Sequence, residues 1–175
     1  MKISIRRGVF ETNSSSSHSL SLCGGSDCEN KHLCRDENNV VITSPGEYGW
    51  NGPTLCSTDE RLSYIITMVF EQYSDEPYLT KKEGQRWLVY DTHKIMETPE
   101  FKEIEKCIVE NTEYTGLKLD QDFYDPDYAY IDHQSFSDDY ESYKDFLDYY
   151  NLTLADFLFN DKYQVIIFND NNAYY

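Results

Sequence analysis

Residues 57–73, STDERLSYIITMVFEQY, decide the fold because they carry the clearest helical pattern in the chain. Apolar side chains recur there at intervals of three and four residues, which predicts a helix with one face turned towards a core. Ser57 and Glu60 form a capping box, so we expect the helix to begin directly after Ser57. The predicted core stripe consists of Leu62, Ile65, Ile66, Val69, Phe70 and Tyr73.

Further helices are expected after this one. Thr98, followed by a proline at the first helical position, predicts the start of a second helix. Residues 137–149 predict an acidic helix that packs Tyr140, Tyr143, Phe146 and Leu147 inward. A short helix is expected through Phe159, with Thr153 as its cap. Residues 87–90 fit a strand or the start of a helix equally well.

Strands are expected near both ends of the chain. Residues 2–6 and 19–22 alternate apolar and polar side chains, which is typical of half-buried strands and indicates a hairpin with an enlarged connection. Residues 164–168 form an unbroken apolar run, so this strand is expected at the centre of its sheet. Residues 40–43 and 128–131 predict two shorter strands.

The length of 175 residues suits one domain that spans 1–175. Strands at both ends with helices between them predict an α+β fold, with a mixed or antiparallel sheet and three to four helices. No apolar run approaches the roughly 18 residues of a membrane span, and the N-terminus lacks the apolar segment of a signal peptide, so a cytoplasmic protein is expected. The five irregularly spaced cysteines do not indicate a disulfide framework, which agrees with a reducing compartment.

The net charge of -17 excludes the overall basic surface that is usual for nucleic-acid-binding proteins. Residues 110–150 carry twelve carboxylates against two lysines, together with eight tyrosines. Disordered acidic tails are poor in aromatic residues, so the acidic, tyrosine-rich region 120–150 is expected to form a folded surface. Its candidate binding residues are Asp138, Asp139, Glu141 and Asp145.

The run FETNSSSSH, residues 10–18, is dense in short polar side chains that compete with the backbone for hydrogen bonds. This composition predicts a loop of tight turns. Such a loop can bind phosphate or the backbone of a partner, and it can equally satisfy its own hydrogen bonds as a connection between two strands. The candidate binding residues are Asn13, Ser14, Ser15, Ser16, Ser17 and His18.

The segment GEYGW, residues 46–50, surrounds two aromatic side chains with turn residues. Two interpretations are equally favoured: Tyr48 and Trp50 anchor an interface, or they close over the core.

The segment DHQS, residues 132–135, follows a predicted strand. Asp132 and His133, together with His18, are residues whose protonation can be tuned for acid–base catalysis or metal binding. The favoured alternative is a turn at the strand end, in which the aspartate accepts backbone hydrogen bonds.

The segment 23–39 is expected to form a long loop, because it is rich in Gly, Ser, Asp, Asn and Cys. Its Cys23, Cys28, His32 and Cys34 can supply four zinc ligands. Their spacing matches no standard zinc finger or ribbon, so free thiols in a loop are the favoured alternative. No other cofactor is expected.

Three motifs occur in order along the chain: RGVFETNSSSSH at 7–18, GEYGW at 46–50 and YIDHQS at 130–135. Together they resemble an uncharacterised family found in phages and prophages, especially of Firmicutes. The resemblance covers the chain as a set of landmarks and implies no enzyme activity. A phage setting implies an anti-defence role in the cytoplasm of a bacterial host, and some type II anti-CRISPR proteins are similar to this chain in size and charge.

The favoured hypothesis is a protein that binds and inhibits a host nuclease, of the Cas9-like kind, with the region 120–150 in place of nucleic-acid phosphates. The alternative is a small enzyme that acts on a phosphate ester or nucleotide, with the serine loop binding phosphate and His18, Asp132 and His133 transferring protons. A third possibility is direct contact with nucleic acid through the basic residues Lys2, Arg6 and Arg7.

Overall fold

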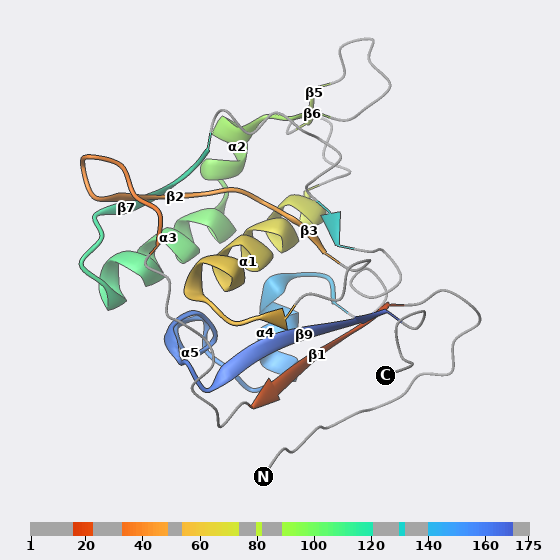
Figure 1. Cartoon of the computed structure of the whole chain (residues 1–175). Coiled ribbons are helices and arrows are strands. Elements are labelled where there is room, and N and C mark those ends of the chain that lie inside the picture. The colour runs from red at the N-terminus through yellow and green to blue at the C-terminus, as the bar shows by residue number, and fades with distance from the viewer. Residues whose placement is uncertain are drawn as a thin grey trace.

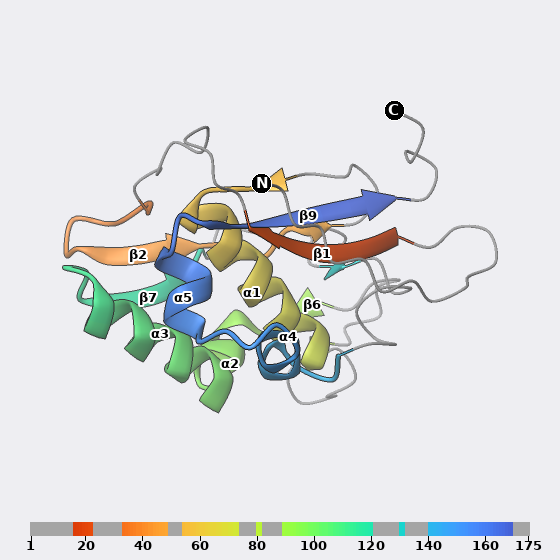
Figure 2. The same ribbon diagram turned by 90° about the horizontal axis from the view of Figure 1, so that it is seen from below.

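The computed structural model describes residues 16–22, 33–48, 54–73, 80–81, 89–120, 130–131 and 140–169 and confirms an α+β architecture. Helix α1 (Thr58–Gln72) lies in the middle, with α3 (Pro99–Asn111) on one side and the strands β1 (Ser16–Leu22) and β9 (Tyr163–Asn169) on the other (Figures 1 and 2). The remaining elements are β2 (Val40–Thr43), β3 (Glu47–Tyr48), β4 (Thr54–Leu55), β5 (Thr80–Lys81), β6 (Val89–Tyr90), α2 (Thr92–Met96), β7 (Gly116–Leu119), β8 (Tyr130–Ile131), α4 (Tyr143–Tyr149) and α5 (Leu154–Phe159).

The described strands form four small sheets. Strand β9 lies at the centre of an antiparallel sheet of order β1-β9-β4, which confirms the prediction for residues 164–168. Strand β2 pairs in parallel with β7, and β3 pairs in parallel with β8. Strands β5 and β6 form an antiparallel pair, so the undecided segment 87–90 ends in a strand.

The serine run differs from its prediction. Ser16, Ser17 and His18 belong to β1 and pair with Asn169, Phe168 and Ile167 of β9, so this part of the run is a strand and not a loop. Serine's local preference for turns is overridden because the apolar β9 offers these residues a continuous backbone ladder. The predicted strand at 2–6 lies outside the described residues.

Two helices also differ from their predictions. Helix α4 begins after Ser142 and not at 137, because the Ser142 hydroxyl accepts a hydrogen bond from the Asp145 N–H at 3.3 Å and so caps the helix. Five helices are found in the described residues in place of three to four. The additional helix is α2, whose five residues are too few to show a helical period.

Helix α1 is buried well beyond its predicted stripe. Nine of its fifteen residues are buried, among them Tyr64, Thr67 and Met68, which lie outside the stripe. The capping box is confirmed: the Ser57 hydroxyl accepts from the Glu60 N–H at 3.2 Å, and the Glu60 carboxylate accepts from the Ser57 N–H at 3.0 Å. A helix covered on several faces requires other elements around it, and this explains its central place in Figure 1.

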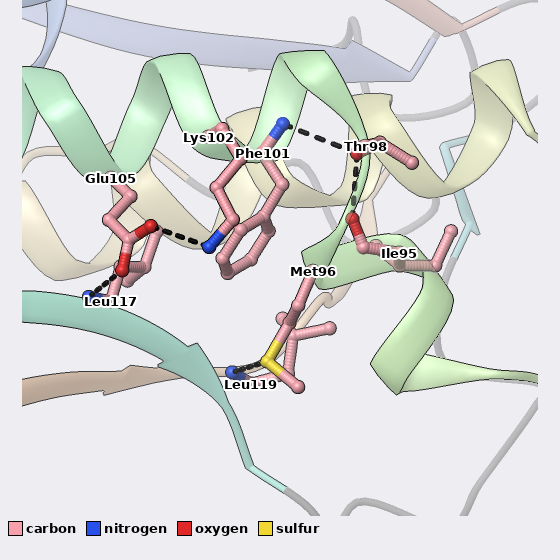
Figure 3. A network of polar contacts seen from close by, with 8 residues as sticks. All are labelled: Ile95, Met96, Thr98, Phe101, Lys102, Glu105, Leu117 and Leu119. Atoms are coloured by element: carbon pink, nitrogen blue, oxygen red, sulfur yellow. Dashed lines mark hydrogen bonds and ion pairs between the residues drawn. The ribbon is translucent and has the colours of Figure 1, made fainter.

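Helices α2 and α3 cover the free edge of β7 with side chains of Met96 and Glu105 (Figure 3). The Leu117 N–H donates to the Glu105 carboxylate at 3.3 Å, and the Leu119 N–H donates to the Met96 sulfur at 3.4 Å. Exposed strand N–H groups invite pairing with other chains, so these contacts guard against edge-to-edge association. Thr98 caps the start of α3 as predicted, because its hydroxyl accepts a hydrogen bond from the Phe101 N–H at 3.3 Å.

Arg61 has no exposed surface and joins α1 to the end of α5. Its guanidinium donates to the carbonyl of Phe157 at 2.9 Å, to that of Asn160 at 2.8 Å and to that of Tyr163 at 3.4 Å. The last carbonyls of a helix lack partners within it and carry the negative end of its dipole. Arg61 therefore satisfies these carbonyls and fixes the turn that leads into β9.

Replacing Arg61 by methionine keeps the aliphatic packing but removes the donors from several buried carbonyls. We expect the free energy of unfolding to fall by about 2–4 kcal/mol, as measured by urea-induced unfolding. Lys162→Met, which removes an exposed cation, is the control and should be close to neutral. Equal stability of wild type and Arg61→Met would contradict the role assigned to Arg61.

Candidate interaction surface

The predicted serine site is described only in part. Ser16, Ser17 and His18 lie on β1, whereas Asn13, Ser14 and Ser15 lie outside the described residues. The basic residues Lys2, Arg6 and Arg7 also lie outside them. A phosphate-binding role for the run therefore stays a prediction.

Two of the three sequence landmarks lie side by side. Strand β3, from GEYGW, pairs with β8, from YIDHQS, so that Glu47 lies opposite Tyr130 and Tyr48 lies opposite Ile131. The Glu71 carboxylate of α1 accepts a hydrogen bond from the Ile131 N–H at 3.3 Å. Trp50, Asp132 and His133 lie outside the described residues, so an acid–base role for this region stays a prediction.

Tyr48 closes over the core, which is one of the two interpretations that the sequence left open. Its side chain is 7% exposed, and its ring meets that of Tyr64 edge to face at 5.1 Å. Its hydroxyl donates to the Ser63 hydroxyl at 2.8 Å, which donates in turn to the Ser44 carbonyl at 2.7 Å. Burial raises the pKa of Tyr48 to about 12. Tyr48 is therefore not available as an exposed anchor.

Gly46 is required by the close approach of the Tyr48 ring. A Cβ at position 46 would lie 2.9 Å from Cζ and Oη of Tyr48. We expect Gly46→Ala to lower the free energy of unfolding by about 1–3 kcal/mol through overpacking, measured by urea-induced unfolding. Gly116→Ala is the matched control, because the nearest atom to a Cβ there is the Glu105 carboxylate oxygen at 3.4 Å. Equal losses in the two variants would refute the steric explanation.

Of the four predicted zinc ligands, the structure describes only Cys34. Cys34 is exposed and its thiol is free, while Cys23, Cys28 and His32 lie outside the described residues. In the part of the chain that the structure describes, no three His, Cys, Asp or Glu side chains are grouped to bind a metal ion. The end of the predicted loop folds back onto β2, since Arg35 pairs with Val41.

Helix α4 carries the described part of the acidic region and is strongly amphipathic. Tyr143, Phe146 and Leu147 are buried against the core. The outward side and its flanks form what we call the acidic tyrosine surface. This surface consists of Tyr140, Glu141, Asp145, Asp148, Tyr149 and Tyr150.

Tyr149 is the most exposed ring of this surface, at 57%. Its ring meets that of Tyr150 at 5.0 Å and that of Tyr140 at 5.7 Å, both edge to face. Both of these rings also contact the buried Phe146, at 5.2 Å and 5.5 Å. The exposed ring is thus held by aromatic contacts that lead into the core.

Tyr149 is not among the binding residues that the sequence predicts. The predicted helix began at 137, outside the described residues, whereas the observed helix begins after Ser142. The buried positions Tyr143, Phe146 and Leu147 fix the helical phase, and this phase turns position 149 outward. That spacing is the signal that identifies Tyr149.

The lysine of α4 is already paired with a carboxylate of α3. Lys144 binds Glu103 at 2.5 Å. Among the described residues, Asp148 and Glu141 form no ion pair. The carboxylates of Glu141 and Asp148 are therefore not neutralised by a cation within the described residues.

Glu103 links α3 to α4 through two side-chain contacts. Its carboxylate accepts hydrogen bonds from Lys144 at 2.5 Å and from the Tyr143 hydroxyl at 3.1 Å. The hydrogen bond from Lys144 is the main reason that the pKa of Glu103 is lowered, and the pKa of Lys144 is raised by the same contact. Burial, and then the charge of Glu103, raise the pKa of Tyr143.

Because the pKa of Glu103 is lower in the folded than in the unfolded state, its carboxylate stabilises the fold at pH values above the ordinary pKa of 4.5. This stabilisation is lost as the pH falls through the lower pKa of the folded state. Glu103→Gln should lower the free energy of unfolding near pH 7 by less than about 1 kcal/mol, because both partners are half exposed. The difference from wild type should shrink below about pH 4 in urea unfolding. A difference that is constant from pH 3 to 7 would contradict the ion pair as its source.

Comparisons of the chain with protein-family models, curated proteins and solved structures find no match. No helix among the described residues is long and apolar enough to cross a membrane.

Proposed function

We propose that this chain is a phage-type anti-defence protein that binds a Cas9-like nuclease of a bacterial host and occupies its nucleic-acid channel. The observation that carries the proposal is the acidic tyrosine surface, whose outward carboxylates at Glu141 and Asp148 have no cationic partner among the described residues. The net charge of -17 supports it, because it repels nucleic acid and attracts a basic groove.

A nuclease channel binds phosphates with arginine and lysine side chains, and carboxylates presented on a rigid helix can take the place of those phosphates. Asp145 and Asp148 are three residues apart on α4, so their Cβ atoms lie about 5–6 Å from each other. The tyrosines add contact area at a low cost in conformational entropy. Attraction of this kind speeds association and weakens as salt is added.

The proposal is tested by reversing charge on the surface. The double variant Glu141→Lys and Asp148→Lys should bind Cas9 nucleases from Firmicutes, loaded with guide RNA, at least about tenfold more weakly than wild type, with a matching loss of inhibition of DNA cleavage. Asp145 is left intact because its carboxylate accepts a hydrogen bond from the Ser142 cap at 2.8 Å. A second variant adds Asp138→Lys and Asp139→Lys.

The matched control is Glu37→Lys with Glu47→Lys, which makes the same change in charge at two exposed positions outside the acidic tyrosine surface, in the turn before β2 and on β3. Its affinity should change by less than about threefold, because salt screens exposed charges that do not contact the partner. Wild-type binding should fall steeply as salt is raised. Failure of wild type to bind or inhibit these nucleases, or equal affinity of both double variants, would refute the proposal.

A further inference from the structure

We infer that the acidic tyrosine surface recognises an arginine side chain of its partner, with the guanidinium stacked on the ring of Tyr149 and paired with the carboxylate of Asp145. This inference rests on the proposed function. It adds that the groove of the partner is lined with arginine side chains. Three features of α4 support it. The ring of Tyr149 is exposed but held in place, the carboxylate of Asp145 lies one turn away, and the surrounding charge is negative.

The ring of Tyr149 is ready to bind because its position is already fixed. Tyr140 and Tyr150 contact it edge to face at 5.7 Å and 5.0 Å, although the side chain is 57% exposed. A ring that is ordered before binding loses little conformational entropy on binding. Such rings are typical anchors at the centre of interfaces.

Asp145 supplies the charged partner for the same guanidinium. It is four residues before Tyr149 on α4 and is exposed, so the two side chains are neighbours on the outward face. One of its oxygens accepts from the Ser142 hydroxyl at 2.8 Å, which holds the carboxylate in place. Glu141 and Asp148 lie on either side of it in sequence and add to the negative potential.

Arginine fits this arrangement better than lysine. The guanidinium is planar and weakly hydrated, so it stacks on an aromatic face while its N–H groups pair with a carboxylate. The lysine ammonium is strongly hydrated and acts as a point charge. A second copy of this chain is disfavoured as the occupant, because its surface carries the same excess of negative charge.

The test uses the intact chain with two fluorescent probes, a nona-arginine and a nona-lysine peptide of equal length and charge. Fluorescence anisotropy at 50 and 150 mM salt should show tighter binding of the arginine peptide. Tyr149→Ala should weaken that binding about three- to fivefold and leave binding of the lysine peptide almost unchanged, whereas Tyr149→Phe should keep the preference. Asp145→Asn, which still accepts a hydrogen bond from Ser142, should also reduce the preference.

Val109→Ala is the control, because it removes another exposed apolar side chain, on α3. Equal binding of the two peptides by wild type, or an equal loss for both peptides in Tyr149→Ala, would overturn the inference. The nuclease assay separates this failure from failure of the proposed function. Inhibition that is lost on charge reversal but unchanged in Tyr149→Ala overturns the inference alone, whereas a wild type that binds no nuclease overturns the proposed function.

Discussion

The burial of α1 is the constraint on which the described structure depends. Leu62, Ile65, Ile66 and Val69 have no exposed surface, and each such side chain contributes about 1.5–3 kcal/mol when it is fully removed from water. Covering a helix on several faces demands neighbours, and α3, α4, α5 and β8 fill these places. The buried guanidinium of Arg61 is stable there because backbone carbonyls accept its hydrogen bonds.

The packing of α1 also determines how the acidic tyrosine surface is presented. Tyr64 of α1 meets Phe146 of α4 at 5.9 Å, and Phe146 contacts both rings that hold Tyr149. Glu103 ties α4 to α3 through Lys144 and the Tyr143 hydroxyl. The outward carboxylates therefore project from a helix whose inner face is fixed, as preorganised recognition requires.

Local signals were sufficient to predict the helices with clear caps. The capping box at Ser57, and Thr98 followed by proline, each place a helix start to the residue because the cap and the helix are neighbours in sequence. The central position of β9 followed from its unbroken apolar run. These features need no knowledge of the rest of the chain.

Features that depend on distant residues could not be predicted in this way. Ser16 to His18 form a strand only because β9, some 150 residues later, pairs with them. The choice between anchor and core for Tyr48 depended on Ser63 and Tyr64 of α1. Tyr149 is different, because the spacing of Tyr143, Phe146 and Leu147 is a local signal that is sufficient to turn position 149 outward.

Hydrogen–deuterium exchange of the chain, alone and bound to a guide-loaded nuclease that it inhibits, would locate the interface directly. We expect slower exchange in α4, residues 143–149, and unchanged exchange in the turn at residues 36–39 before β2. Slower exchange confined to other segments, with α4 unchanged, would contradict it.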